Sequence, residues 1–297
     1  MHAHAHAHER RPGADRRALG GALALTLAFA AIEVAGGIAA HSLALVADAG
    51  HMVTDAASLG LAFLAVWLAG RPATPQRSYG WRRAEILAAL ANGAGLVALA
   101  AWIFFEAARR LAHPAEVRGG WVLGIGLAGL AVNVGVAGVL RRAGRGSLNV
   151  RAALAHVLAD LASSLGVIAA AAVVLATGWQ RIDPLIGIGI GVLVLGSSVG
   201  VLRESLAILL EGTPAGISAE EVGGAMAAHA GVVSVHDLHV WTITSGFPAL
   251  SAHVLVEPGA DCHRIRLELD ALLRERFGLD HTTLQVEHRA GLVTLGR

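Results

Sequence analysis

The chain has little of what most soluble proteins are built from. Only 15% of its 297 residues are charged and 4% are aromatic, while 55% are hydrophobic; soluble domains average about 25% charged residues. A single cysteine, Cys262, excludes an intramolecular disulfide framework and a zinc module built from several cysteines. Lysine is missing, because all 23 basic residues are arginine. With a mean hydropathy of +0.61, this composition indicates a polytopic membrane protein.

Two common catalytic and nucleotide-binding motifs are also missing. No His-Glu-x-x-His helix is present to build a metalloenzyme site. The glycines at 187, 189 and 191 lie in an apolar run with no Lys-Ser/Thr beside them, so they do not form a phosphate loop. We expect these glycines to serve helix packing. The sequence therefore favours neither an enzyme nor a protein with a prosthetic group.

Six apolar stretches approach or exceed the roughly 20 residues that cross a bilayer. All are rich in alanine, glycine and valine, small residues that let membrane helices pack closely. We predict a transmembrane domain at residues 18–212, preceded by a histidine-rich tail at 1–17. The predicted spans are Ala18 to Ala39, Leu43 to Leu68, Ile86 to Ala107, Trp121 to Leu140, Leu154 to Thr177 and Pro184 to Val201.

Residues 213–297 are predicted to form a soluble domain. Acidic residues become frequent there, and the alternation of residues 250–257 is typical of a strand. Ser218 followed by Glu221 forms a capping box, which marks the start of a helix. The order of elements predicts a small α-β-β-α-β sandwich. Its elements are helices at Ser218 to Ala230 and Cys262 to Phe277, strands at Val232 to Thr242, Ala249 to Glu257 and Thr282 to Glu287, and a turn at Ser245 to Pro248.

Arginines are distributed unevenly over the predicted loops. Four fall in the N-terminal tail, four in the second loop (residues 71–83) and four around the fourth loop (residues 141–151), whereas the first loop has none and the fifth only Arg181. The positive-inside rule then places both termini and the soluble domain in the cytoplasm. The third loop, with Arg109, Arg110 and Arg118, fits this pattern less well, although Glu106 and Glu116 lie nearby to offset it.

Two predicted spans each carry a histidine and an aspartate four residues apart. They are His51 with Asp55 and His156 with Asp160, and residues at this spacing share a helix face. Ionisable groups inside a membrane are costly and usually functional. Two imidazoles and two carboxylates facing one another supply the tetrahedral shell that Zn²⁺ prefers. A single pair could merely hydrogen-bond to neighbours in the bundle, but two pairs of the same spacing favour a metal site.

Two further polar residues lie on the same faces. Asp48 is seven residues before Asp55, and Asn149 is seven before His156. We interpret them as groups that orient the ligands or line the entry path, with a structural hydrogen bond as the alternative for each.

The predicted ligand set favours transport over catalysis. Four protein ligands leave no open position for a reactive water, which a catalytic zinc site keeps. Imidazole binds metal only when neutral, so metal and protons compete for the same groups near neutral pH. We therefore predict proton-coupled zinc export. The alternative is a metal channel or sensor that does not pump, and it would move no protons.

Histidine is also concentrated at both ends of the chain. Residues 1–8 carry a histidine at every second position, a pattern that indicates weak metal capture or a neutral tail. In the soluble domain, His236 and His253 fall on adjacent predicted strands, while His281 and Glu287 bracket the last one. Several of these groups could converge at one sheet edge as a regulatory site. Their individual roles as ligands stay open on this reasoning.

Five segments resemble the cation diffusion facilitator family, in particular its zinc-transporting branch. The resemblance implies a six-helix membrane protein with cytoplasmic termini, a ferredoxin-like cytoplasmic domain, a homodimer and Zn²⁺/H⁺ antiport across an inner or plasma membrane. The segments are His41 to Asp55, Tyr79 to Asn92, Asn149 to Asp160, Leu210 to Pro214 and His236 to Trp241.

The same resemblance implies particular site residues. The transport site falls on His51, Asp55, His156 and Asp160. The cytoplasmic metal site falls on His236, His253 and Glu287, with His263 and His281 as additional candidates. Zn²⁺ is then the substrate and the regulatory ligand, with Cd²⁺ or Co²⁺ as other substrates, and the partners are a second copy, the bilayer and protons but no nucleic acid. A metal site that some bacterial members have after the second helix is not expected, because residues 71–83 hold no His, Asp or Cys.

Overall fold

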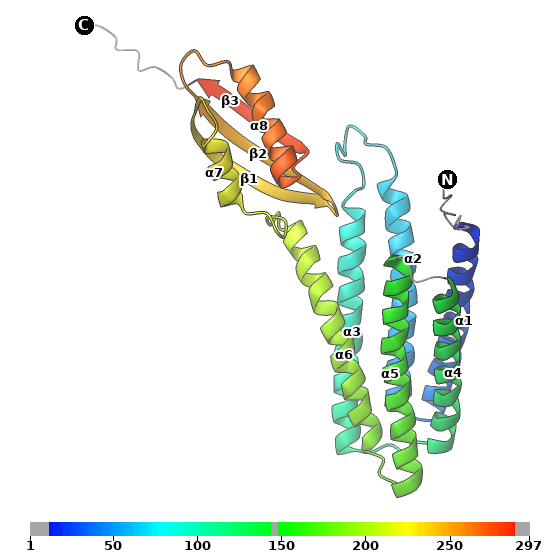
Figure 1. Cartoon of the computed structure of the whole chain (residues 1–297). Coiled ribbons are helices and arrows are strands. Elements are labelled where there is room, and N and C mark those ends of the chain that lie inside the picture. The colour runs from blue at the N-terminus through cyan, green and yellow to red at the C-terminus, as the bar shows by residue number, and fades with distance from the viewer. Residues whose placement is uncertain (1–11, 144–147, 289–297) are drawn as a thin grey trace, which may run out of the picture. The chain divides into compact units, whose positions relative to one another are not determined.

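The structure, a computed structural model, describes residues 12–143 and 148–288, with side chains left undescribed at 12–23, 139–143, 148–156 and 159. The predicted histidine tract at 1–8 lies outside the described residues. The described residues form six long helices, followed by a domain of two helices and three strands, and Figure 1 labels these elements. In chain order they are α1 Pro12–Ala39, α2 Leu43–Ala69, α3 Ala84–Ala112, α4 Gly119–Ala143, α5 Leu148–Thr177, α6 Ile182–Leu209, α7 Ala219–Ala227, β1 Val232–Thr244, β2 Phe247–Val256, α8 Cys262–Phe277 and β3 His281–His288.

Each of the six predicted spans falls within a helix, α1 to α6, and five of these helices are confirmed as apolar spans. Within the described residues, α2 to α6 each contain a segment long and apolar enough to cross a membrane, whereas the described apolar part of α1 is the shorter stretch Ala24–Ala39. Several helices extend past the predicted spans; α3, for example, continues to Ala112. Hydropathy detects only the part of a helix that lies in hydrocarbon, so polar helical turns beyond it were missed.

The chain divides into two compact units. The first holds residues up to Gly60 together with Asn92–Val199, and the second holds Leu61–Ala91 together with Gly200–Arg297. The connection between α2 and α3 therefore belongs to the same unit as the C-terminal domain. Each unit has its own buried core.

Small residues allow the helices of the first unit to approach closely. Alanines 40, 44 and 47 of its core are fully buried beside Ile103 and Val167. A Cβ added at Gly191 of α6 would lie 2.8 Å from the Phe104 ring, too close for any larger residue without displacement. Gly187 is similarly tight against Leu43, but nothing lies within 4 Å of an added Cβ at Gly189. The packing role expected for these glycines thus holds for two of the three.

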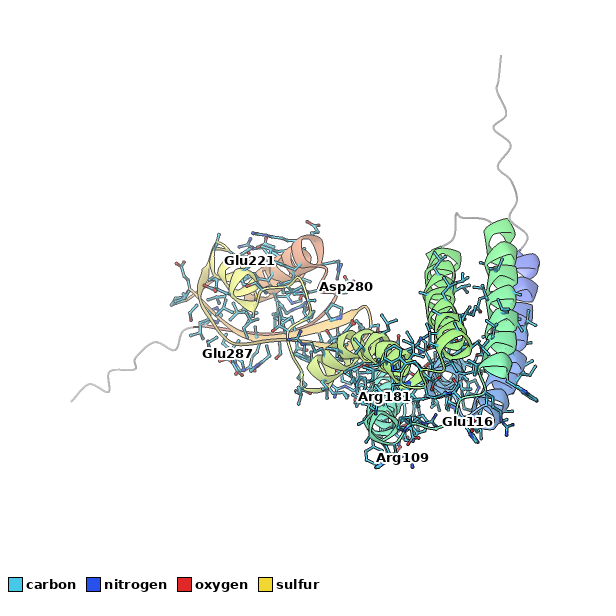
Figure 2. The ribbon with its side chains drawn as sticks, turned by 90° about the horizontal axis from the view of Figure 1, so that it is seen from below. Arg109, Glu116, Arg181, Glu221, Asp280 and Glu287 are labelled. Carbon is cyan, nitrogen blue, oxygen red and sulfur yellow. The ribbon has the colours of Figure 1, made fainter. Side chains whose placement is uncertain are left out.

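One end of the first unit is held together by polar contacts. Asp183 at the start of α6 accepts hydrogen bonds from the Leu43 amide at 2.6 Å and the Ser42 hydroxyl at 2.5 Å, so it caps the N-terminus of α2. Glu106 accepts from both Arg109 and Arg110 at 2.7 Å. The positive charge of Arg109 and Arg110 is therefore partly offset by one shared carboxylate. Figure 2 looks onto this end, with Arg109, Glu116 and Arg181 labelled.

The C-terminal domain has the predicted α-β-β-α-β order. Its sheet runs β1-β2-β3, with β1 and β2 antiparallel and β2 and β3 parallel. Both helices bury residues in one core against the sheet, including Met226 of α7 and Leu269 of α8. The Ser218 hydroxyl accepts from the Glu221 amide at 3.3 Å, which confirms the predicted helix cap.

The hairpin turn is shorter than predicted. β1 continues to Thr244 and β2 begins at Phe247, so only Ser245 and Gly246 connect them. Gly246 has φ +71°, which a two-residue hairpin needs and which only glycine adopts without strain. The proline at 248, which suggested a longer turn, lies within β2 opposite Thr242.

Candidate metal-binding sites

Three of the predicted ligands in the membrane helices come together. His51 and Asp55 lie one turn apart on α2, Asp160 lies on α5, and one ligand atom from each falls within 4.8 Å of the others. His51 Nε2 and Asp55 Oδ2 are 3.5 Å apart. One nitrogen and two carboxylate oxygens at this spacing suit a zinc ion. The two helices therefore form a candidate metal centre.

The fourth predicted ligand lies one turn away on the same helix. His156 belongs to α5 and precedes Asp160 by four residues, so both residues occupy one face of that helix. The side chain of His156 lies outside the described residues. The backbone thus agrees with a four-ligand shell, and the assignment of His156 as a ligand stays a prediction.

Asp48 lies beside this centre and is tied to it through Ser163. The Ser163 hydroxyl lies 2.5 Å from Asp48 Oδ1 and 2.9 Å from the carbonyl oxygen of Asp160. Asp48 is almost fully buried at 2% exposure. This contact connects α2 and α5 beside the ligands, and the supporting role of Asp48 stays a prediction. Asn149, also on α5, has a side chain outside the described residues.

A buried glutamate near the centre was missed by the sequence analysis. Glu33 on α1 is 1% exposed, and its Oε1 lies 2.9 Å from the position that a Cβ on Gly129 of α4 would take. The carboxylates of Asp48 and Asp160 are near enough to act on Glu33 electrostatically. The signal was present, because an acidic residue alone in an apolar span is costly and rarely incidental.

The arrangement as a whole can hold a divalent cation away from water. Four acidic groups from α1, α2 and α5 gather with a histidine, and Asp160 is only 5% exposed. Negative charge at this density is stabilised by a bound cation or by protons. The site is therefore chemically fitted to alternate between metal and protons.

A second group of histidines lies on the sheet of the C-terminal domain. His236 of β1 is directly opposite His253 of β2, and their ring centroids are 5.3 Å apart. Asp237 joins them, with Oδ2 3.7 Å from His253 Nε2 and Oδ1 3.0 Å from His239 Nε2. The predicted placement of His236 and His253 on adjacent strands is seen. His239 and Asp237 belong to the same histidine-rich stretch of the sequence but were not named as ligands.

An irregularity in β1 brings Asp237 to this position. The pairing register shifts between His236 and His239, and Asp237 has φ +50°, which is unusual for a residue with a side chain. The hydrogen bond from His239 is the main cause that lowers the pKa of Asp237, followed by the charge of His239. An ionised carboxylate thus lies beside several histidines on an exposed surface.

The other predicted residues of this domain are distributed over three places. Gln285 of β3 is paired with His253, and Glu287 follows two residues later on the same face. His281 lies at the opposite end of β3, where its ring contacts Phe247 at 5.2 Å and Tyr79 at 5.9 Å. His263 is the second residue of α8, and its amide donates to Asp261 at 3.0 Å. Glu287 therefore lies two residues from the strand position paired with His253, whereas His281 lies at the other end of β3.

Comparison with known families gives two matches that together cover most of the chain. The family described as "Cation efflux transmembrane domain" matches residues 21–210, and "Cation efflux protein, cytoplasmic domain" matches residues 214–289.

Individual relatives are similar over nearly the full length of the chain. The "Cadmium, cobalt and zinc/H(+)-K(+) antiporter" of Bacillus velezensis is 36% identical over 290 residues, covering 96% of this chain and 92% of that protein. The "Zinc transporter ZitB" of Escherichia coli is 38% identical over 291 residues, covering 97% and 93%. A proton-coupled zinc antiporter of Homo sapiens is 32% identical over 290 residues, covering 93% and 78%.

Proposed function

The chain belongs to the cation diffusion facilitator family of multi-pass membrane transporters, and from this premise we propose that it exports Zn²⁺ in exchange for protons by alternating access. The observation that carries the proposal is the cluster of His51, Asp55 and Asp160 between two apolar helices. Relatives named as zinc transporters or zinc antiporters support zinc as the cargo. Cadmium and cobalt are further substrates on this proposal, supported by the name of the Bacillus relative.

The proposed transport site consists of His51, Asp55, His156 and Asp160. Asp48 and Asn149 are its proposed supporting residues. Neutral imidazole and ionised carboxylate are the forms that bind metal, so zinc binding releases protons and proton binding releases zinc. Exposing one such site alternately to the two sides of the membrane couples the two fluxes in opposite directions.

The proposed topology places both termini and the C-terminal domain in the cytoplasm, with the protein in a bacterial inner membrane or a plasma membrane. The distribution of arginine supports this orientation. The pairing of Glu106 with Arg109 and Arg110 adds to that support. It reduces the net positive charge of the α3–α4 loop, on the opposite side of the membrane.

We further propose a homodimer assembled through the cytoplasmic domain, which matches a family domain associated with dimers. The group of His236, His253 and Glu287 is its proposed regulatory zinc site. At a high cytoplasmic zinc concentration, zinc would bind to this exposed group and so regulate transport.

Transport into proteoliposomes tests the proposal directly. Protein is reconstituted with its cytoplasmic side outward around an acidic lumen, zinc is added outside, and lumenal zinc and pH are recorded with two dyes. We expect zinc to enter while the lumen becomes more alkaline. Asp160→Asn should abolish both signals, because it removes a ligand charge while keeping the side-chain shape.

A matched control separates loss of a ligand from loss of structure. Asp183→Asn also alters a buried carboxylate, but one that caps α2 away from the ligands, so zinc and proton flux per folded molecule should persist. Zinc entry without any pH change would indicate the channel alternative. Equal transport by Asp160→Asn and the parent would refute the assigned site.

A further inference from the structure

The connection between α2 and α3 has no acidic residue of its own to balance its positive charge. Residues 70–83 include Arg71, Arg77, Arg82 and Arg83 and no Asp or Glu. At the other end of the membrane helices, Glu106 holds Arg109 and Arg110 in ion pairs. Among the described residues, only Arg83 of the four loop arginines pairs with a carboxylate, Glu211 at 3.4 Å. Three arginines of this loop therefore keep their full charge available to a partner.

Aromatic rings hold these arginines in place. The Arg71 guanidinium lies 4.0 Å from the centroid of Trp67, and that of Arg77 lies 3.6 Å from the centroid of Trp81. Arg82 lies 4.5 Å from the ring of Phe247. Stacking uses the flat face of the guanidinium and leaves its N–H groups pointing outward at the edge. Such a group is oriented in advance to bind a phosphate with two parallel hydrogen bonds.

The loop backbone is a defined structure. Thr74 and Arg77 exchange two backbone hydrogen bonds of 3.1 and 2.9 Å, and the Gly80 amide donates to the Arg77 carbonyl at 2.8 Å. Gly80 has φ +65°, a conformation that favours glycine. The arginines thus project from a folded turn, which lowers the entropy lost when they bind a ligand.

A pocket opens beside this turn within the second unit. Its volume is about 940 Å³, and Arg77, Ser78, Tyr79, Arg82 and Arg83 line it, with Trp241 of β1 among the other lining residues. Three arginines and hydroxyl groups around one cavity favour an anionic ligand with oxygen acceptors. Glu211 is the one acidic residue in the lining, and it is paired with Arg83.

The position of the loop identifies the source of that anion. It directly follows the apolar span of α2, where Trp67 is 53% exposed, and it contains Tyr79 at 47% exposure. Exposed tryptophan and tyrosine at the end of a span occupy the headgroup layer of a bilayer. Arginine clusters next to a span attract anionic lipids.

We propose that the turn at residues 71–83 binds the phosphate of an anionic phospholipid headgroup, with Arg77 and Arg82 as its main donors. The inference rests on membrane insertion and on the loop itself, and it is independent of the zinc site. The lipid would anchor the α2–α3 connection and the adjoining part of the C-terminal domain to the bilayer surface.

The test measures lipid binding by the intact, delipidated protein. Native mass spectrometry in neutral detergent follows binding of phosphatidylglycerol and, separately, of phosphatidylcholine. We expect the parent to prefer phosphatidylglycerol. The double variant Arg77→Gln with Arg82→Gln should bind it about tenfold more weakly or worse, since each arginine supplies a charge-assisted hydrogen bond. Arg77→Lys with Arg82→Lys should be intermediate, because lysine keeps the charge but not the stacked fork.

The matched control removes the same charge elsewhere. Arg264→Gln with Arg276→Gln lies on α8 outside the pocket lining and should bind phosphatidylglycerol like the parent. Monodisperse elution of each variant establishes that it is folded. Equal binding of the two lipids by the parent, or parental binding by the Arg77/Arg82 glutamine variant, would overturn the proposal. Displacement of the lipid by equimolar inorganic phosphate would also overturn it, by assigning the pocket to soluble phosphate.

Discussion

Two clusters in this chain use the same chemical groups in very different surroundings. In the membrane helices, the side chains of His51 and Asp55 are 17% and 23% exposed. On the sheet, those of His253 and Asp237 are 40% and 62% exposed. Charges interact weakly when water surrounds them and strongly when it is excluded. The buried cluster is thus suited to holding one ion in transit, and the exposed one to exchanging ions readily with the cytoplasm.

The comparison also separates local from long-range positioning. The exposed cluster is assembled by strand pairing within one hairpin, whose register puts His236 opposite His253. The buried cluster requires two helices far apart in sequence to pack in register, with Ser163 contacting Asp48 between them. Variants that weaken helix packing should therefore affect the buried cluster and leave the exposed one intact.

The largest expected effect comes from removing a charge in the buried cluster. Asp55→Asn removes the charge of a proposed zinc ligand. Losing a residue that only hydrogen-bonds to a ligand weakens metal binding roughly 10–100-fold, so Asp55→Asn should weaken zinc binding at the transport site by more than that. Zinc-dependent transport in proteoliposomes measures this. His253→Ala is the counterpart in the exposed cluster and should reduce transport far less. If the two variants were equally impaired, the assignment of one cluster to transport and the other to regulation would fail.

An intermediate effect is expected from the contact behind the ligands. Ser163→Ala removes the hydroxyl that lies 2.5 Å from Asp48 and should weaken zinc binding roughly 10-fold. Equilibrium zinc titration of the purified protein tests this. Ser197→Ala is a suitable control, since its hydroxyl only donates to a carbonyl of its own helix, Val194 at 2.8 Å. Parental zinc affinity in Ser163→Ala would show that Asp48 does not act through this contact.

The smallest expected effect is the pH response of the exposed cluster. The bond from His239 lowers the pKa of Asp237, so this carboxylate stabilises the folded domain fully above its unfolded pKa of about 3.9. That contribution is lost as the pH falls through the lower folded pKa. Hydrogen exchange of β1 in the intact protein, compared with Asp237→Asn, should show a small acid-dependent difference that vanishes below this range. A difference that instead grew as the pH fell would contradict the ionised assignment.

The tertiary structure alone decided which distant groups meet. Glu33 comes close to Gly129, and Asp183 caps α2 from a position 140 residues later. Neither contact can be predicted from the periodicity of a single segment, since each depends on how helices pack. The strained backbone of Asp237 and the two-residue turn at Gly246 likewise follow from strand pairing, which overrode the longer turn suggested by proline.

What the sequence by itself determined was the set of helices and strands and the chemistry that two of the helices carry. The six apolar runs, the α-β-β-α-β order and the His-Asp spacing on α2 and α5 are local patterns, because helix periodicity and the cost of membrane charge act within one segment. Bringing Asp160 to His51 and Asp55, and separating His281 from His253, required the packed structure. The sequence therefore predicted which residues could bind a metal. Which of them lie close together was decided by the contacts between segments.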